Sequence, residues 1–400
     1  MASKSVYDWK AELPLSDFGP FRLVILQATS FCNLDCDYCY LPDRRSKNQL
    51  SLELLDPIFK HLFTSRFLGE RFTVAWHAGE PMSVPISFYE AAFDRIQQID
   101  KRYNTTGCKV SHSIQTNGTF INQRWCDLIK HHNICLGVSL DGPAFLHNSH
   151  RKTLTGMGTH AGVMRGIELL QKNKIDFRVI AVLTQESLDY PNELFNFFID
   201  NGIRRVGFNV EEVEGINHTT SLTQSDTDLR YRNFMKQFWT LVKQHPGTLQ
   251  IREFERICGL IYSERRIAWN QLCRPFSMVN IDNQGNFTTY SPELLAMKNP
   301  TYGDFILGNV KTDTFESVCA TDKFKHIYQD IQAGVEQCRQ ECEYFGLCGG
   351  GAPSNKYWEN GTFRSTETNS CRYNKKAITD ILVEDLEASL GLVQLSTTQI

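Results

Sequence analysis

Six apolar, β-rich runs alternate with segments of helical periodicity between residue 22 and about residue 210, and this alternation constrains the fold more than any other feature. The runs read FRLVILQAT, FTVAWH, KVSHSIQ, ICLGVSL, FRVIAVLT and RRVGFNV. Strands that alternate with helices pair in parallel, because each helix returns the chain to the same end of the sheet. The sequence therefore predicts an α/β fold, a partial (β/α)6 barrel of the TIM type.

The intervening helices are expected near SLELLDPIFKHLF, ISFYEAAFDRIQQI, NQRWCDLIKHH, HAGVMRGIELLQK and NELFNFFIDN. Further helical segments at about 226 to 264 lead into a region rich in Cys and Gly. Because single cores rarely exceed about 250 to 300 residues, a chain of 400 residues is expected to carry a second domain. We predict an N-terminal extension at 1–20, the barrel at 21–265, and a C-terminal domain at 266–400 that ends in a helix.

Composition and charge argue against several classes of protein. No apolar run approaches the roughly 20 residues of a membrane helix, and the first residues, MASKSVYDWKAELPLSDFGPF, lack the apolar segment of an export signal. A formal charge of −3 without a long basic run does not favour a nucleic-acid partner. We expect a cytoplasmic protein with neither a membrane nor a nucleic acid as its partner.

The 13 cysteines indicate metal binding rather than disulfides, because their number is odd and the chain is long without an export signal. Three of them follow the first predicted strand as Cys32-x3-Cys36-x2-Cys39. Thiolates suit iron and sulfide, and three on one loop can bind three corners of a four-iron cluster while the fourth iron stays open. A zinc site that lacks its fourth ligand, or simple buried thiols, are the alternatives.

Polar motifs also follow the next three predicted strands. HAGEP comes after the second, QTNGT after the third and SLDGP after the fourth. Chemistry in parallel barrels is located at the C-terminal ends of the strands, so these motifs are expected to share one face with the cysteine loop. Taken singly, each has a structural alternative as a turn glycine, a solvated carboxylate or a surface charge.

Cys32, Cys36, Tyr38 and Cys39 match the C-x3-C-x-aromatic-C signature of the radical S-adenosylmethionine (SAM) superfamily, which the sequence resembles. The resemblance implies a [4Fe-4S] cluster with an open iron for SAM. AGEP resembles the GGEP motif of that family, with Ala78 in place of the first Gly. By the same resemblance, contacts to SAM or to the substrate side are implied for Gly79, Glu80, Gln115, Asn117, Ser139, Asp141 and Arg151.

A second group of cysteines lies near the C-terminus and encloses the run GLCGGGAPSNKYWENG. The group is formed by Cys338, Cys342, Cys348 and Cys371. Four thiolates can complete a cluster, and three consecutive glycines allow positive φ and a close approach of the backbone to sulfur. This region resembles the SPASM domain, an auxiliary-cluster module of radical SAM enzymes that modify peptides or proteins.

Two positions depart from the SPASM pattern. Tyr290 stands where a cysteine is expected after Cys273 and Gly285, and Ala352 stands where the last cysteine of another segment is expected. Both losses fall on the auxiliary cluster nearer the active site. We therefore expect one auxiliary [4Fe-4S] cluster rather than two, while the role of Cys273 stays open.

The phrases AVLT, FNVEEVEG and GLCGGGAPSNK are similar to those of cyclophane-forming peptide maturases, the GrrM and OscB group. The resemblance implies an oxidoreductase that joins an aromatic ring carbon to a nearby β-carbon in a ribosomally synthesised precursor peptide. It also implies an electron donor such as flavodoxin or ferredoxin. Glu293, close to Tyr290, is the candidate catalytic base; an exposed loop glutamate is its structural alternative.

Three rival functions remain open. An anaerobic sulfatase-maturing, formylglycine-forming enzyme shares segments like QTNGT and SLDGP but normally keeps both auxiliary clusters. A thioether-forming peptide maturase would need a cysteine in its precursor. A non-catalytic iron-sulfur or zinc scaffold would bind a partner without cleaving SAM.

Overall fold

One continuous sheet runs through the part of the chain that the structure describes, which is residue 13, residues 15–295 and residues 297–392 of a computed structural model. Its strands are β1 (Leu23–Leu26), β2 (Arg71–Trp76), β3 (Lys109–Thr116), β4 (Cys135–Ser139), β5 (Phe177–Leu183), β6 (Arg205–Val210), β7 (Gln250–Ile251), β8 (Met278–Ile281), β9 (Asn286–Thr289) and β10 (Gly308–Asn309). The order is β10-β9-β8-β1-β2-β3-β4-β5-β6-β7, and β1 to β7 are parallel. The predicted α/β fold and all six predicted strands are confirmed.

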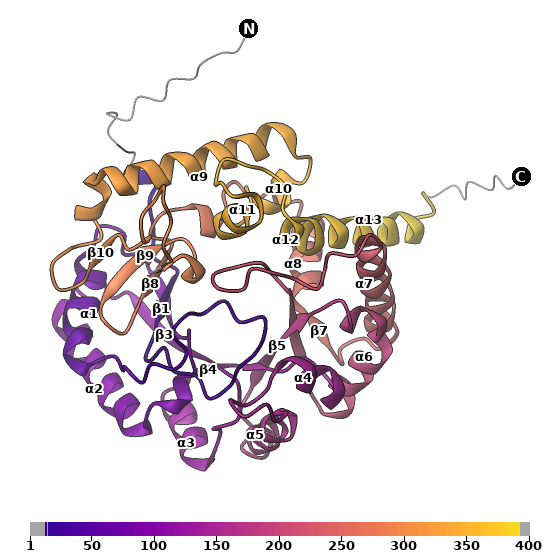
Figure 1. Ribbon diagram of the computed structural model, residues 1–400, viewed down its shortest axis with the longest axis horizontal. Helices are drawn as coiled ribbons and strands as arrows, with labels where there is room; N and C mark the ends of the chain where they lie inside the picture. Colours follow the sequence, from indigo (N-terminus) through magenta and orange to yellow (C-terminus); the bar gives the residue numbers. More distant parts are fainter. Residues whose placement is uncertain (1–12, 14, 296, 393–400) are drawn as a thin grey trace, which may run out of the picture.

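The helices are arranged around the arc of strands, and those from the first part of the chain cover its outer side, as Figure 1 shows. They are α1 (Leu55–Thr64), α2 (Ile86–Tyr103), α3 (Gln123–His131), α4 (Ala144–His150), α5 (His160–Lys172), α6 (Pro191–Asp200), α7 (Thr227–Gln244), α8 (Arg252–Tyr262), α9 (Asp322–Glu341), α10 (Phe345–Cys348), α11 (Pro353–Asn360), α12 (Asn369–Cys371) and α13 (Ile378–Ser389). Short 3₁₀ turns are η1 (Leu15–Asp17), η2 (Leu52–Leu54), η3 (Pro81–Ser83), η4 (Ser187–Asp189), η5 (Gln271–Cys273), η6 (Pro292–Leu294) and η7 (Ser317–Ala320), and η8 (Arg372–Ala377) is π-helical.

Alternate residues of the strands serve two different surfaces. In β2, Phe72, Val74 and Trp76 are buried on the side of the helices, and Trp76 packs edge-on against Tyr89 of α2 at 5.2 Å between ring centroids. Ala75, between them, is only half-buried and points to the inner side of the arc. The inner side and the C-terminal ends of the strands are thus left for polar side chains.

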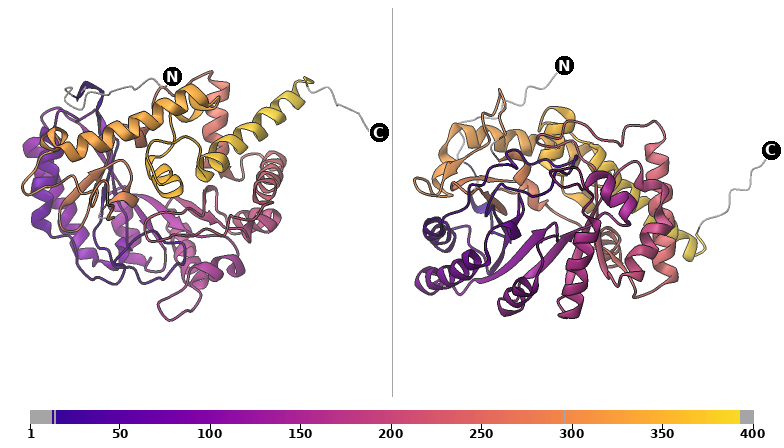
Figure 2. Two further views of the ribbon diagram at one scale, coloured as in Figure 1. Left: turned by 45° about the horizontal axis from the view of Figure 1, so that its top comes forward. Right: turned by 60° about the horizontal axis from the view of Figure 1, so that its bottom comes forward.

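The C-terminal region completes the sheet as well as covering it. β8 pairs in parallel with β1, and β9 pairs antiparallel with β8, so both extend the barrel sheet beyond its first strand. The helices α9 to α12 lie across the open side of the arc in Figure 1, and the views in Figure 2 agree. The polar edge of the barrel therefore lies next to the C-terminal cysteine region.

The last described helix, α13, packs against α7 and α8, and the Trp239 indole donates a hydrogen bond to Asp385 at 2.9 Å. Of the predicted N-terminal extension at 1–20, residues 1–12 and 14 lie outside the described residues. None of the described helices is both long and apolar enough to traverse a bilayer.

Candidate functional site

The loop after β1 brings three cysteines together by backbone hydrogen bonds. The Cys32 N–H donates to the Arg44 carbonyl at 3.0 Å, and the Cys39 N–H donates to the Cys36 carbonyl at 3.3 Å. The Leu34 N–H points at the Cys32 sulfur at 3.4 Å. A sulfur that accepts a backbone N–H is in a suitable setting for a cluster ligand, because such bonds stabilise negative charge on the thiolate.

The thiols of this loop fit an iron-sulfur cluster. Burial raises the pKa of Cys32 to about 12, with smaller contributions from Glu80, Cys36 and Cys39. Burial likewise raises the pKa of Cys36 to about 11, so both sulfurs need a metal to become thiolates. Within the described ranges, no three His, Cys, Asp or Glu side chains converge closely enough for a single metal ion. Three thiols on one loop suit a cluster in which each thiolate binds a different iron, whereas a structural zinc site takes four protein ligands.

Glu80 joins the loops that follow β2 and β3. The carboxylate is 1% exposed and accepts hydrogen bonds from the Met82 N–H at 2.8 Å, the Thr116 hydroxyl at 2.7 Å and the Asn117 N–H at 2.7 Å. Burial raises the pKa of this carboxyl to about 7 in spite of these donors. Glu80 thus fixes the predicted SAM-binding motifs to one another.

Gly79 allows the AGEP segment to lie directly against the cysteine loop. Its φ is +101°, and an added Cβ would lie 2.2 Å from the Thr29 carbonyl oxygen, so no other residue fits. The adjoining Glu80 N–H donates to the Phe31 carbonyl at 2.8 Å. Ala78 also has a positive φ, 67°, at the position where the GGEP motif has its first glycine.

The predicted contacts on β3 and β4 lie at the same edge of the sheet. The Gln115 amide donates to the Ser139 hydroxyl at 3.0 Å. The Asn117 amide donates to Asn33 at 2.8 Å and lies 3.9 Å from the Cys32 sulfur. These contacts connect the ends of neighbouring strands to the cysteine loop.

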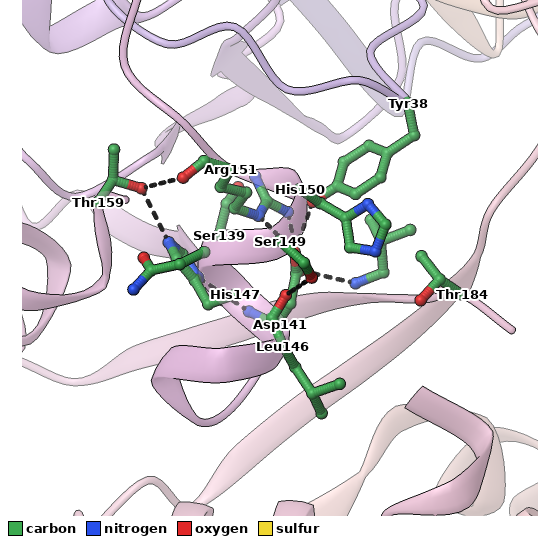
Figure 3. A network of polar contacts seen from close by, with 12 residues as sticks. Tyr38, Ser139, Asp141, Leu146, His147, Ser149, His150, Arg151, Thr159 and Thr184 are labelled. Atoms are coloured by element: carbon green, nitrogen blue, oxygen red, sulfur yellow. Dashed lines mark hydrogen bonds and ion pairs between the residues drawn. The ribbon is translucent and has the colours of Figure 1, made fainter. Parts of the chain in front are cut away.

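Asp141 and Arg151 form a buried ion pair at the centre of the network in Figure 3. The carboxylate accepts hydrogen bonds from Arg151 Nε at 2.8 Å and Nη2 at 3.0 Å, and from the Tyr38 hydroxyl at 2.5 Å. The Val182 N–H adds a fourth bond at 2.9 Å. Although burial alone would raise the pKa of Asp141, the Arg151 charge holds it below its usual value. Arg151 thus binds Asp141 through Nε and Nη2, and its third nitrogen, Nη1, is not used in this ion pair.

His147 connects this pair to Thr159, as Figure 3 shows. Its Nδ1 accepts the Asp141 N–H at 3.3 Å, and its Nε2 lies 3.0 Å from the Thr159 hydroxyl. Because that hydroxyl donates to the Arg151 carbonyl at 2.8 Å, His147 must donate from Nε2 and is neutral. Burial lowers the pKa of His147 to about 3, in agreement with this assignment.

Comparison with known proteins matches this geometry. The sequence profile described as the Radical SAM superfamily matches residues 26–198, which include the cysteine loop and the strands that carry the polar motifs. An uncharacterized protein of Synechocystis sp. strain PCC 6803 is 54% identical over 381 residues, which are 95% of this chain and 96% of that protein. The chain belongs to the radical SAM superfamily.

Two further similar proteins have known functions or ligands. A serine-type anaerobic sulfatase-maturating enzyme of Bacteroides thetaiotaomicron is 25% identical over 361 residues, covering 84% of each chain. The structure of native anSMEcpe with bound AdoMet and Cp18Cys peptide superposes with a TM-score of 0.74 at 23% identity, covering 94% of this chain and 100% of that one. The protein is therefore a radical SAM enzyme, and the family implies a [4Fe-4S] cluster and SAM as its cofactors.

The C-terminal cysteines gather around the glycine run of this radical SAM enzyme. Burial raises the pKa of Cys371 to about 12, and the charges of Cys348, Cys342 and Cys338 raise it further. The Gly351 N–H donates to the Cys348 sulfur at 3.1 Å. Gly349, Gly350 and Gly351 all have positive φ, at 71°, 111° and 76°, as the sequence predicted. Backbone thus approaches sulfur here just as it does in the first loop.

Cys273 lies beside this group but is bonded to the protein. Its thiol donates to the Gly351 carbonyl at 3.0 Å, and its pKa is raised to about 12, mainly by burial. Tyr290 is 1% exposed, and its hydroxyl has no hydrogen-bond partner among the described residues. The side chain that replaces the expected cysteine is thus part of the core.

Glu293 lies in η6 and lines a cavity of about 460 Å³, rather than standing on an exposed loop. Burial, with Glu212 nearby, raises the pKa of Glu293 to about 7. Burial also raises the pKa values of Glu214 and Tyr40, and the charge of Glu293 contributes to both. The structure therefore gathers three ionisable groups at this end of the barrel.

Several residues with clear roles were absent from the sequence predictions. Lys356, 3% exposed, donates to the Gly334 carbonyl at 2.8 Å and to the Cys338 sulfur at 3.2 Å. His147, Thr159 and Glu214 are likewise buried beside the predicted site. Lys356 and Glu214 carried a signal, since they lie in the phrases GLCGGGAPSNK and FNVEEVEG.

Proposed function

We propose that this radical SAM enzyme is a SPASM-type maturase that cross-links a ribosomally synthesised precursor peptide, joining an aromatic ring carbon to a nearby β-carbon. The observation that carries the proposal is that two residues at the expected place of a second auxiliary cluster are packed or hydrogen-bonded within the protein itself. Tyr290 is buried where a cysteine ligand is expected, and Cys273 donates to the Gly351 carbonyl. A single auxiliary cluster on Cys338, Cys342, Cys348 and Cys371 is the arrangement that this supports.

The proposed site roles divide along the sheet edge. Cys32, Cys36 and Cys39 would hold the first cluster, and when bound, the cluster and SAM supply a 5′-deoxyadenosyl radical that removes hydrogen from carbon. Gly79 would let the backbone lie close to SAM. The residues that would line the SAM side are Glu80, Gln115, Asn117, Ser139, Asp141 and Arg151. Arg151, fixed by Asp141, would present Nη1 to a carboxylate.

Glu293 would act as the base in this scheme. After a β-carbon radical of the peptide adds to the aromatic ring, the ring must lose one electron and one proton to become aromatic again. A carboxylate with a pKa of about 7 can take that proton at neutral pH. The modified unit has then lost two hydrogens in all, and the electron would leave through the auxiliary cluster. An electron donor such as flavodoxin or ferredoxin would reduce the first cluster.

Two further parts of the proposal concern organisation. The peptide partner is supported by the bound peptide in the anSMEcpe structure, which shares the fold. The division into 1–20, 21–265 and 266–400 is retained as a functional one, with SAM chemistry in the second segment and the auxiliary cluster in the third. Strands of the second and third segments belong to the same sheet.

Anaerobic co-expression with a short peptide of repeated aromatic-x-x units, followed by mass spectrometry, tests this function. We expect a loss of two hydrogens per modified unit and a new ring-to-β-carbon bond in fragment spectra. Cys36→Ala should abolish the mass change. An unchanged peptide mass while wild-type protein releases 5′-deoxyadenosine would reject the cyclophane assignment.

A sulfatase-maturating function is the second candidate, because a serine-type anaerobic sulfatase-maturating enzyme aligns with 84% of this chain. Such an enzyme would oxidise a cysteine or serine in a target protein. Incubation with sulfatase-derived peptides that carry either residue distinguishes the two: an aldehyde product would favour maturation of sulfatases, and its absence would favour cross-linking.

A further inference from the structure

A cavity of about 460 Å³ separates the cysteine loop from the C-terminal strands. One wall is formed by residues 40–43 together with 46 and 48, and the other by β8, the turn into β9, and Glu293. Ala78 of the AGEP motif and Ser30 before the cysteine loop also line it, but none of the six side chains proposed to line the SAM side, from Glu80 to Arg151, does. The cavity therefore adjoins the radical-generating site without being the proposed SAM pocket, and its size suits a small ligand or a short stretch of chain.

Asn280 lies in this cavity wall with its hydrogen-bonding capacity unused. The residue is 1% exposed, yet among the described residues neither Oδ1 nor Nδ2 has a hydrogen-bond partner. Asn280 sits opposite Ile25 of β1 and opposite Thr288 of β9, so its side chain shares the face of Ile25, which also lines the cavity. Because native proteins rarely leave a buried amide unpaired, a carboxamide in this position indicates a ligand.

The chemistry of the lining defines what that ligand must be. The charged residues of the lining are Asp43, Asp282 and Glu293, and no Lys, Arg or His is among them, so an anion would be repelled. A carboxamide offers one acceptor beside two donors. Its complement is a neutral group that offers a donor and an acceptor side by side, as the N–H and C=O of one residue do in an extended peptide.

We propose that Asn280 binds the backbone of the substrate peptide, with Oδ1 accepting the N–H and Nδ2 donating to the C=O of one residue held beside Glu293. The inference rests on the proposed function in taking the substrate to be a peptide. Because Asn280 would contact only the backbone of the bound peptide residue, peptide residues with different side chains can occupy this position. The neighbouring Tyr40 hydroxyl, buried and without a partner among the described residues, adds a second donor at the same cavity.

The test uses a minimal probe with one such residue, N-acetylalanine N-methylamide, and its ester analogue in which oxygen replaces the alanine N–H. Binding to the anaerobic holoenzyme with SAM is measured by saturation-transfer NMR. We expect the amide probe to bind about tenfold more weakly to Asn280→Leu than to wild type, since two hydrogen bonds are lost. The ester analogue keeps the C=O but lacks the N–H, so it should bind wild type more weakly than the amide probe does, and its binding should differ less between wild type and Asn280→Leu.

Asn283→Leu is the matched control, because this amide lines the same cavity but already donates to the Asn48 carbonyl at 3.4 Å. It should bind the amide probe as wild type does. Asn280→Ala, with a smaller side chain, repeats the test should leucine disturb folding, and urea midpoints verify both variants. Equal binding of the amide probe to wild type and to the folded Asn280 variants, or no binding to wild type, would overturn the proposal.

Failure of the proposed function gives a different result. A precursor peptide unchanged in mass, together with probe binding that depends on Asn280, would remove the cyclophane assignment and support the backbone site. A cross-linked precursor formed at the same rate by Asn280→Leu would do the opposite.

Discussion

Removal of the Asp141 carboxylate should destabilise the fold far more than removal of a surface carboxylate. Asp141 is 4% exposed and Arg151 7% exposed, and the pair is joined at 2.8 and 3.0 Å. Asp141→Ala would leave the guanidinium charge buried without a partner. Loss of one member of such a pair typically costs about 3–5 kcal/mol. The hydrogen bonds from Tyr38 and Val182 would lose their acceptor as well.

The chain offers a matched control in the exposed pair of Asp176 and Arg205, whose side chains are 72% and 42% exposed at a distance of 2.6 Å. Asp176→Ala should cost less than about 1 kcal/mol, because solvent screens the charges. The assay is urea unfolding under anaerobic conditions, followed by far-UV circular dichroism. The double variant Asp141→Leu with Arg151→Met should lose clearly less stability than the sum of its two single variants, since no unpaired charge remains.

The same pair gives a sign for the pH dependence. The pKa of Asp141 is lowered in the folded protein, so its contribution is present above its unfolded value, about 3.9, and disappears as pH falls through the folded value. The wild type, but not Asp141→Leu with Arg151→Met, should show this acid loss. Equal costs for Asp141→Ala and Asp176→Ala, or additive costs in the double variant, would refute the reasoning.

Three other perturbations test separate parts of the site. If Glu293, with its pKa raised to about 7, is the base, the rate of product formation should rise as pH increases through 7. Glu293→Gln should lower this rate about 100-fold and remove the rise, as measured by peptide mass spectrometry. A variant with an unchanged pH profile would exclude Glu293 as the base. Gly79→Ala should destabilise the protein by more than about 2 kcal/mol in urea unfolding, because of its positive φ and the 2.2 Å approach to Thr29, whereas Gly156→Ala, with positive φ but open space, should cost about 1 kcal/mol. Lys356→Met should make the midpoint potential of the auxiliary cluster more negative, on the order of tens of millivolts in an EPR-monitored titration, because a positive charge 3.2 Å from the Cys338 sulfur favours the reduced state; a rise in potential would contradict this role.

The sequence predicted those elements whose signal is local and periodic. The first six strands of the barrel were predicted, because each belongs to an alternation with amphipathic helices. The strands β7 to β10 were not predicted, because each has only two to four residues and lies beyond the alternation that identified β1, which is equally short. α4 was missed because it directly follows the SLDGP turn and spans only seven residues.

For the site residues, too, only features with a local sequence signal could be predicted. The positive φ of Gly349 to Gly351 could be predicted, because consecutive glycines carry that property themselves. The pairing of Asp141 with Arg151 and the contact of Lys356 with Cys338 could not, since each depends on where separate loops meet. Asn280 reads as an ordinary strand residue in MVNI, and its lack of a partner is visible only in the folded chain.

Iron content tests the central claim most directly, namely that two separate sets of cysteines bind two clusters. After anaerobic reconstitution, the wild type should contain about eight irons per chain, and about four should remain when either Cys32, Cys36 and Cys39 or Cys338, Cys342, Cys348 and Cys371 are replaced by alanine. A wild-type content of about twelve, or a content that does not fall when the first three cysteines are replaced, would contradict the account.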